Sequence, residues 1–393
     1  MKQVSGITRL LRSLRAGGHE LAYRLAGPIE RSIARRNQAR YCKSFVAVTG
    51  SVGKSTTTSL TGRLLGLEAR AVTGLYQNTP RQTMRPLRKL DAPADFVVQE
   101  VSGHRPGALD DIVATLRVDI AVVTTIGLDH HAAFRTDAAV AAEKGKLVAA
   151  LGPSGIACLN ADDPLVRAMA SRCRGRVVLY GRDPAAEVRA ENVTAHWPER
   201  LRFDLVVGGR RIPVATRFVS TLMLTNLLAA LAVVHAAGHD LGRAVEALRQ
   251  IEPLPDRLGV RTGFDQHGYV VDTYKASYWS TRRLMEDLPN WGAAPRIVVL
   301  GDLSDVGNDG SRKYRQTLKA AAKSADLVIG VGHSAGPAAR LRAAGSSNIV
   351  SAGSLDEVRV MLAAAPPSLV LLKSNRLYPL RQLVPRQTPV AAG

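Results

Sequence analysis

The sequence predicts an α/β protein with a P-loop central domain on a mostly parallel sheet and a smaller, Rossmann-like α/β domain after it. From Phe45 onward, apolar β-rich segments alternate with helical ones, an order typical of parallel sheets. The first of these segments runs into the glycine-rich loop Gly50–Ser55. Two prolines in Glu252–Pro255 then interrupt the alternation and form the clearest break in the chain.

The expected strands follow from this alternation. In the first half they are followed by an antiparallel hairpin around Gly208-Gly209 and a long helical stretch from Leu222 to Ile251. We therefore expect a basic N-terminal segment (1–44), a central domain (45–252) and a C-terminal domain (253–393). The predicted strands are Phe45–Thr49, Phe96–Val101, Ile120–Thr124, Ile156–Asn160, Val177–Tyr180, Tyr269–Asp272, Ile297–Leu300, Leu327–Val331 and Leu369–Leu372.

Composition limits the class of protein. A chain of 393 residues with 46% hydrophobic content can bury the cores of two or three domains. Its three cysteines form no Cys-x-x-Cys pair, which argues against a disulfide framework or zinc site and favours a cytoplasmic location. Polar residues interrupt the longest apolar run, Leu222–Gly238, so we expect a core helix there and not a membrane span. No secretory signal is indicated.

The charge is strongly basic, at +20, and favours acidic partners. Residues 1–44 carry ten basic side chains against two acidic ones. Two alternatives stay open for this segment: contact with an anionic membrane surface or acidic polymer, or packing against the domain that follows. Specific nucleic-acid binding is not expected at 5% aromatic content. Apolar residues at helical spacing predict amphipathic helices around Ile7, Leu10, Leu11, Leu14, Leu21, Leu25 and Ile29.

The loop after the first strand has the chemistry of a triphosphate site. Backbone N–H groups in such a loop point at the phosphates, Lys54 neutralises the outer ones and the Ser55 hydroxyl holds Mg²⁺. The general P-loop has a glycine five positions before its Gly-Lys pair, where this sequence has Val48. What remains is the shorter form Thr-Gly-Ser-x-Gly-Lys-Ser.

Two further strands end in ionisable residues. Glu100 lies at the carboxyl end of its strand, where open α/β sheets place ligand groups, and a carboxylate there suits a hard cation. His130 closes the segment Thr124–His130 after the next strand. On the residues alone, such a histidine is more often a surface residue than a metal ligand.

In this order, the loop, Glu100, Thr124–His130 and Ala142–Lys146 resemble the central domain of the Mur ligase superfamily of ATP-dependent amide-bond-forming enzymes. The resemblance implies ATP and Mg²⁺ as cofactors, and Lys144 as a lysine that many members carry as a carbamate. It implies catalytic roles for Lys54, Glu100, His130 and Lys144, and metal ligation by Ser55, Glu100, His130 and Lys144. The ATP-binding set that it implies in this half is Gly50, Ser51, Val52, Gly53, Lys54, Ser55, Thr56 and Asn226.

The C-terminal half continues the resemblance. Pro255–Leu258 is similar to the family's Pro-Gly-Arg linker, with Asp256 in place of glycine. Val271–Ser277, Val299–Leu303 and Leu371–Arg376 resemble segments of the D-alanyl-D-alanine-adding members. These matches imply that Arg257 and Asp272 contact ATP. They also imply that Lys275, Lys373 and Arg376 grip the carboxylate of an amine substrate.

The sequence also departs from the family. Only 44 residues precede the ATP-binding strand, so we expect the family's N-terminal uridine-nucleotide domain to be absent. The family's His-Asn pair near the base falls around Leu222-Met223, and only Asn226 agrees. Tyr76–Pro80 replaces the asparagine-rich substrate loop.

Together these features predict an ATP-dependent carboxylate–amine ligase that works through an acyl phosphate. Its expected partners are an amino acid or dipeptide and an acidic acceptor. Two alternatives stay open: a poly-amino-acid synthase of the poly-γ-glutamate type, and a catalytically degenerate nucleotide-binding scaffold.

Overall fold

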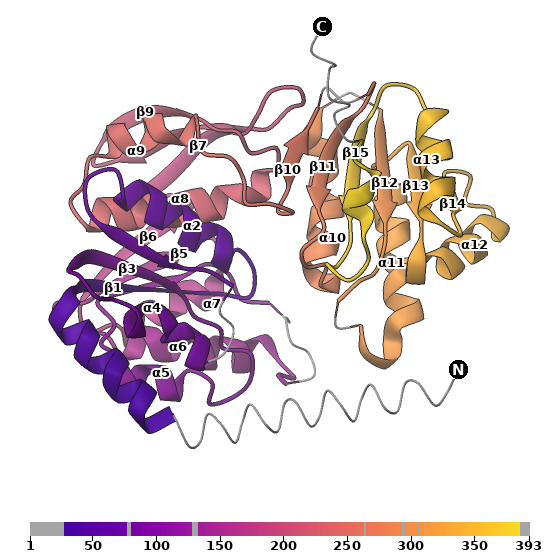
Figure 1. Ribbon diagram of the computed structural model, residues 1–393. Helices are drawn as coiled ribbons and strands as arrows, with labels where there is room; N and C mark the ends of the chain where they lie inside the picture. Colours follow the sequence, from indigo (N-terminus) through magenta and orange to yellow (C-terminus); the bar gives the residue numbers. More distant parts are fainter. Residues whose placement is uncertain are drawn as a thin grey trace, which may run out of the picture.

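The computed structural model describes residues 27–76, 80–127, 133–262, 265–292, 295–304 and 306–385. It contains two sheets, each with its own helices, that form two adjoining lobes (Figure 1). The predicted fold class is confirmed.

The first lobe is built on a nine-stranded sheet in the order β2-β3-β1-β4-β5-β6-β7-β8-β9. Its neighbours pair in parallel as far as β7, and β7, β8 and β9 form an antiparallel meander. The β8–β9 pair of this meander is the predicted hairpin. The strands are β1 (Cys42–Thr49), β2 (Ala71–Gly74), β3 (Ala94–Glu100), β4 (Ile120–Val123), β5 (Ile156–Asn160), β6 (Arg176–Gly181), β7 (Val188–Thr194), β8 (Arg202–Val207) and β9 (Arg210–Ala215).

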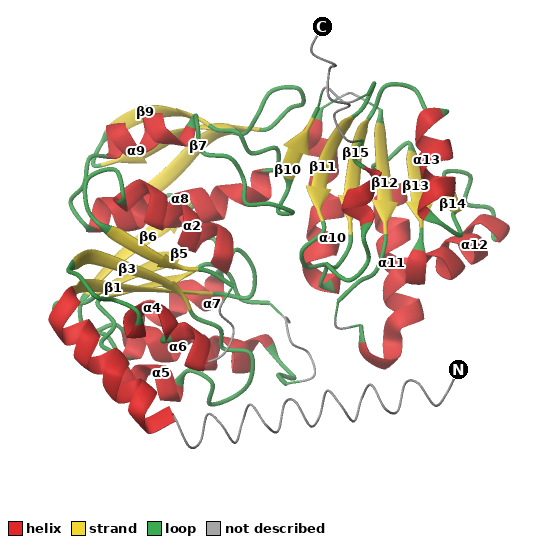
Figure 2. Ribbon diagram, viewed as in Figure 1, coloured by secondary structure: helices red, strands yellow, loops and turns green. Residues whose placement is uncertain are grey.

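Helices cover both faces of this sheet (Figure 2). One face carries α2 (Lys54–Leu65), α8 (Leu224–Ala236) and α9 (Leu241–Leu248). The other face carries a helix over residues 27–41 and the helices α3 (Pro80–Thr83), α4 (Arg85–Arg88), α5 (Asp110–Thr115), α6 (Asp137–Ala149) and α7 (Pro164–Arg167).

The prediction of one helical stretch from Leu222 to Ile251 is wrong in one respect, because the segment forms two helices, α8 and α9. Gly238 has φ 73°, a left-handed conformation that stops α8. Asp240 then caps α9 by accepting a hydrogen bond from the Gly242 N–H.

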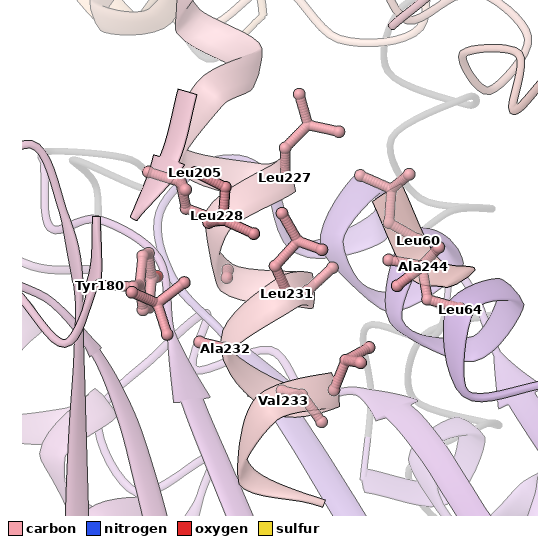
Figure 3. Close-up of a cluster of buried hydrophobic side chains, with 14 of the residues drawn as sticks. Leu60, Leu64, Tyr180, Leu205, Leu227, Leu228, Leu231, Ala232, Val233 and Ala244 are labelled. Atoms are coloured by element: carbon pink, nitrogen blue, oxygen red, sulfur yellow. The ribbon is translucent and has the colours of Figure 1, made fainter. Parts of the chain in front are cut away.

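Helix α8 forms the centre of the core, as expected for an apolar helix inside a domain. Its residues from Leu227 to Val234 are almost fully buried. They pack against Leu60 and Leu64 of α2 on one side and Tyr180 and Leu205 of the sheet on the other (Figure 3). Within the described part of the chain, no helix is long and apolar enough to cross a membrane.

The helix over residues 27–41 packs against the first lobe. The Arg35 guanidinium donates to the carbonyl oxygens of Ala114 and Thr115, and Gln38 exchanges hydrogen bonds with the Arg117 backbone. The earlier part of the segment, with the predicted amphipathic positions from Ile7 to Leu25, lies outside the described residues.

The second lobe is a six-stranded sheet in the order β10-β11-β15-β12-β13-β14, parallel except for β10. Its strands are β10 (Gly259–Arg261), β11 (Gly268–Asp272), β12 (Arg296–Leu300), β13 (Leu327–Gly330), β14 (Ile349–Ser351) and β15 (Leu369–Lys373). Its helices are α10 (Tyr278–Asp287), α11 (Gly310–Ala322), α12 (Ala335–Ala343) and α13 (Leu355–Ala363). Short 3₁₀ helices occur at Ala168–Arg172 (η1), Thr221–Met223 (η2), Leu288–Trp291 (η3), Gly307–Asp309 (η4), Gly332–Ser334 (η5) and Leu380–Leu383 (η6).

Candidate nucleotide and substrate site

The loop between β1 and α2 needs glycine at two positions. At Gly50, a Cβ atom would lie 1.9 Å from Thr124 Oγ1. Gly53 caps α2 at φ 84°, and a Cβ atom there would lie 2.7 Å from Asn226 Nδ2. The first N–H groups of α2 lack intrahelical partners, so this tight loop presents them to an anion.

Side chains fix the loop to the end of β4. Ser51 Oγ donates to the carbonyl oxygen of Gly127 at 2.8 Å and accepts from its N–H at 3.0 Å. Thr124 Oγ1 donates to the carbonyl oxygen of Val52 at 2.6 Å. The Lys54 ammonium folds back over the loop and donates to the Gly50 carbonyl oxygen at 2.8 Å.

Ser55 and Glu100 meet at the start of α2. Ser55 Oγ donates to Glu100 Oε2 at 2.7 Å, and both side chains are buried. Two ligands at right angles on an octahedral Mg²⁺ are roughly 2.9 Å apart, so this pair of oxygens fits that ion. The Tyr76 backbone N–H also donates to Glu100 Oε2, at 3.1 Å.

The other two predicted metal ligands are placed differently. His130 lies outside the described residues. Lys144 is buried on α6, at 3% exposure, and is not among the described residues that line the cavity. The adjacent Glu143 accepts from the N–H groups of Gly107 and Leu109 and so fixes the loop after β3. Metal ligation by Lys144 stays a prediction, as does that by His130.

A cavity of about 450 Å³ lies between the lobes. From the first lobe it is lined by the loop, Glu100 and the start of α8; from the second, by the carboxyl ends of β11 and β15 and by α10. Twelve predicted site residues line it: Ser51, Val52, Gly53, Lys54, Ser55, Thr56, Glu100, Asn226, Arg257, Asp272, Lys275 and Lys373. The fold therefore gathers residues from segments more than two hundred positions apart, while Gly50 and Arg376 do not appear in the lining.

Asn226 offers a hydrogen-bond donor beside the loop. Its side chain is 4% exposed, and Nδ2 has no hydrogen-bond partner within the part of the chain that the structure describes. Because Asn226 lines the cavity next to Gly53, this amide can donate to a bound nucleotide.

The linker into the second lobe has an unusual backbone. Asp256 and Leu258 have φ values of 58° and 55°. A glycine would adopt the left-handed conformation at Asp256 without steric cost, which explains the family's Pro-Gly-Arg pattern, and aspartate tolerates it better than most residues. The linker places the Arg257 guanidinium 4.2 Å from the ring centroid of Tyr274.

Asp272 and Lys373 form a buried ion pair at the ends of β11 and β15. The Lys373 ammonium donates to Asp272 Oδ2 and, at 2.8 Å, to the Lys275 carbonyl oxygen. Burial lowers the pKa of Lys373, and the Asp272 carboxylate opposes that shift. Lys373 thus holds Asp272 in place, while the exposed Arg376 lies near Tyr274, with its guanidinium 5.9 Å from the ring centroid. Substrate binding by Lys275, Lys373 and Arg376 stays a prediction.

The cavity lining also includes residues that were not predicted as site residues from the sequence, among them Tyr274, His104 and Trp279. Tyr274 stacks on Tyr76 with ring centroids 5.1 Å apart, His104 follows β3, and Trp279 projects from α10. Burial and the nearby charges of Arg105 and Lys144 lower the pKa of His104. Only the three-dimensional contact between the lobes singles out Trp279, although it follows closely on the Val271–Ser277 segment.

The fold and the site define a P-loop nucleotide-binding protein with a second α/β lobe against its phosphate loop. Residues 48–234 match the family model of the Mur ligase middle domain. Over this segment and in its fold, the chain is similar to the Mur ligase superfamily.

Curated relatives show the same similarity. The chain is 27% identical over 350 residues to the UDP-N-acetylmuramoyl-tripeptide--D-alanyl-D-alanine ligase of Mycobacterium tuberculosis, a match that covers 84% of this chain and 68% of the relative. It is 28% identical over 336 residues to the UDP-N-acetylmuramoylalanine--D-glutamate ligase of Pelotomaculum thermopropionicum, covering 84% of this chain and 69% of the relative.

Solved structures show the same fold. MurF from Acinetobacter baumannii superposes with a TM-score of 0.79 at 20% identity, covering 90% of this chain and 78% of that one. The MurF ligase of Thermotoga maritima in complex with ADP gives a TM-score of 0.79 at 20% identity, with 91% and 82% covered.

Proposed function

We propose that this chain is an ATP-dependent carboxylate–amine ligase that adds an amino acid or dipeptide to an acidic acceptor. The observation that carries the proposal is the single cavity in which the phosphate loop and the Ser55–Glu100 pair lie opposite Asp272 and Lys275. ATP phosphates and an amine substrate would meet there. The names of the relatives, which are ligases for D-alanyl-D-alanine and D-glutamate, support a substrate of the peptidoglycan-precursor class.

The reaction would proceed in two displacements. An acceptor carboxylate oxygen attacks the γ-phosphorus of ATP, the bond from that phosphorus to the β-phosphate oxygen breaks, and ADP leaves. The amine nitrogen then attacks the acyl carbon of the acyl phosphate, inorganic phosphate leaves, and the nitrogen loses a proton to form the amide. Each turnover consumes one ATP for each amide.

The chain's own residues would act through position and charge. The N–H groups at the start of α2 and the Lys54 ammonium bind the phosphates, and Arg257 reaches them from the linker. Ser55 and Glu100 would hold Mg²⁺, which supplies further neutralisation of phosphate charge when bound. The predicted ligand His130 would add to that site, and Lys144, as a carbamate, would bind a second Mg²⁺.

We assign the two substrates to the two lobes. Residues 45–252 would bind ATP and the acceptor, and residues 253–393 would bind the amine. Lys275 lines the cavity, and Arg376 lies beside Tyr274, which also lines it. Both cations can therefore reach the carboxylate of an amine substrate in the cavity. Lys373 would act indirectly, by holding the Asp272 carboxylate in place.

The test is phosphate release from ATP and Mg²⁺ across a panel of amino acids, dipeptides and carboxylate acceptors. We expect turnover only when both substrates are present. Lys54→Ala should lower it by about 100- to 1000-fold, because the outer phosphates lose their fixed cation. Lys43→Ala removes an exposed lysine of β1 and serves as the matched control. Nucleotide binding without turnover across the panel would contradict the proposal and favour the scaffold alternative.

A further inference from the structure

Trp279 of the second lobe packs on Gly127 of the first lobe, the residue to which Ser51 of the phosphate loop is hydrogen-bonded. A Cβ atom at Gly127 would lie 2.7 Å from Cε2 and Cζ2 of Trp279, so the indole packs directly on the Gly127 backbone. Both backbone polar groups of Gly127 are bonded to Ser51 Oγ of the loop. The indole is therefore one residue removed from the phosphate-binding loop.

The start of α10 holds this indole in place. The Ser277 side chain caps the helix by accepting from the Ser280 N–H, and Ser277 also forms a β-bridge with Ser304 of the second lobe. Arg283, one turn later, lies 5.1 Å from the indole ring centroid. Figure 1 shows α10 on the side of the second lobe that faces the first.

The position of Trp279 matters because the proposed reaction requires that water be kept from its acyl phosphate. An acyl phosphate reacts with water as well as with an amine, and hydrolysis returns the carboxylate and phosphate with no amide formed. Exclusion of water near the phosphate loop prevents this loss. Trp279 is the one tryptophan among the described residues that line the cavity.

We propose that Trp279 is a positioning residue that shields the phosphate end of the cavity from water when the lobes meet. Gly127 is its counterpart, because any side chain there would push the indole away. This inference rests on the proposed ligase function. In this proposal, the contact between Trp279 and Gly127 couples the use of ATP to the formation of the amide.

The first test measures phosphate released for each amide formed. The wild-type ratio should be close to one. Trp279→Ala should raise the ratio several-fold, Trp279→Phe should restore most of the coupling, and Gly127→Ala should behave like Trp279→Ala. Gly336→Ala is the matched control, since the nearest atom to its Cβ is the end of the Arg340 side chain at 3.7 Å. Slower turnover of Trp279→Ala at an unchanged ratio would overturn the coupling role.

The second test follows the contact without any ligation. Acrylamide quenching of tryptophan fluorescence is measured with Mg²⁺ and ADP, and Trp279→Phe identifies the Trp279 component. Gly127→Ala should make that component more accessible to acrylamide, whereas Gly336→Ala should not. Equal quenching of the Trp279 component in the wild-type, Gly127→Ala and Gly336→Ala proteins would overturn the contact. If the wild-type protein forms no amide with any acceptor, the proposed function and the coupling role both fail, and quenching still decides the contact.

Discussion

Single residues in the linker and on the sheet ends set the geometry of this site. Asp256 is a departure from a family pattern that the backbone conformation explains. The sequence shows only that aspartate replaces glycine in Pro-Gly-Arg. The structure adds that this position is left-handed, so backbone conformation explains the glycine and limits which replacements are tolerated.

Substitutions at Asp256 should therefore sort by their tolerance of a positive φ. We expect Asp256→Asn and Asp256→Gly to change the free energy of unfolding by no more than about 1 kcal/mol. In glycine, relief of strain is offset by a more flexible unfolded chain. Asp256→Val should cost about 1–3 kcal/mol. Thermal unfolding of the three variants checks this order, and equal stability of the valine and asparagine variants would contradict it.

The pair formed by Asp272 and Lys373 should behave as one unit. Lys373→Met leaves a buried carboxylate without its cation, so we expect a loss of about 3–5 kcal/mol in the free energy of unfolding. The double variant Asp272→Asn/Lys373→Met removes both charges and should recover much of that loss. Urea denaturation of the single and double variants measures the coupling. Additive losses would show that the two charges do not interact.

At the scale of elements, one buried carboxylate joins η2 of the first lobe to α10 of the second. Asp287 is 5% exposed. It accepts hydrogen bonds from the hydroxyls of Ser220 and Thr221, and from Trp291 Nε1 at 2.8 Å. This joint sets the position of α10, and so of Trp279, against the first lobe.

Removal of that carboxylate should loosen the joint. Asp287→Ala leaves several buried donors unpaired, and we expect a loss of about 3 kcal/mol in the free energy of unfolding. The neighbouring Glu286 is exposed and forms a surface ion pair with Arg282, so Glu286→Ala should cost no more than about 0.5 kcal/mol. Chemical denaturation compares the two variants. A similar loss in both would mean that the joint contributes little.

Sequence periodicity could predict the long central strands, because β1, β3, β5 and β12 each contain a run of consecutive apolar residues that is largely buried. It missed β2, β10 and β14, which are only three or four residues long and partly exposed, so their pattern is too short to read. The break after α8 escaped notice because a single glycine, Gly238, is also tolerated inside a helix.

At the scale of the molecule, the carboxyl ends of strands from both sheets line one cavity. The loop and Glu100 could be predicted from the sequence because their motifs are local. The Trp279–Gly127 contact could not, because it depends on how the second lobe docks. Nor could the absence of Lys144 from the described cavity lining be read from a motif, since it depends on how α6 packs.

The central claim is that this cavity makes an amide through an acyl phosphate, and oxygen transfer tests it most directly. The acceptor is prepared with ¹⁸O in its carboxylate and turned over with ATP, Mg²⁺ and the amine that the activity panel identifies. We predict that one ¹⁸O atom per amide appears in the released phosphate, because the oxygen that attacks the γ-phosphorus leaves with it. Phosphate without ¹⁸O, alongside amide formation, would contradict the account.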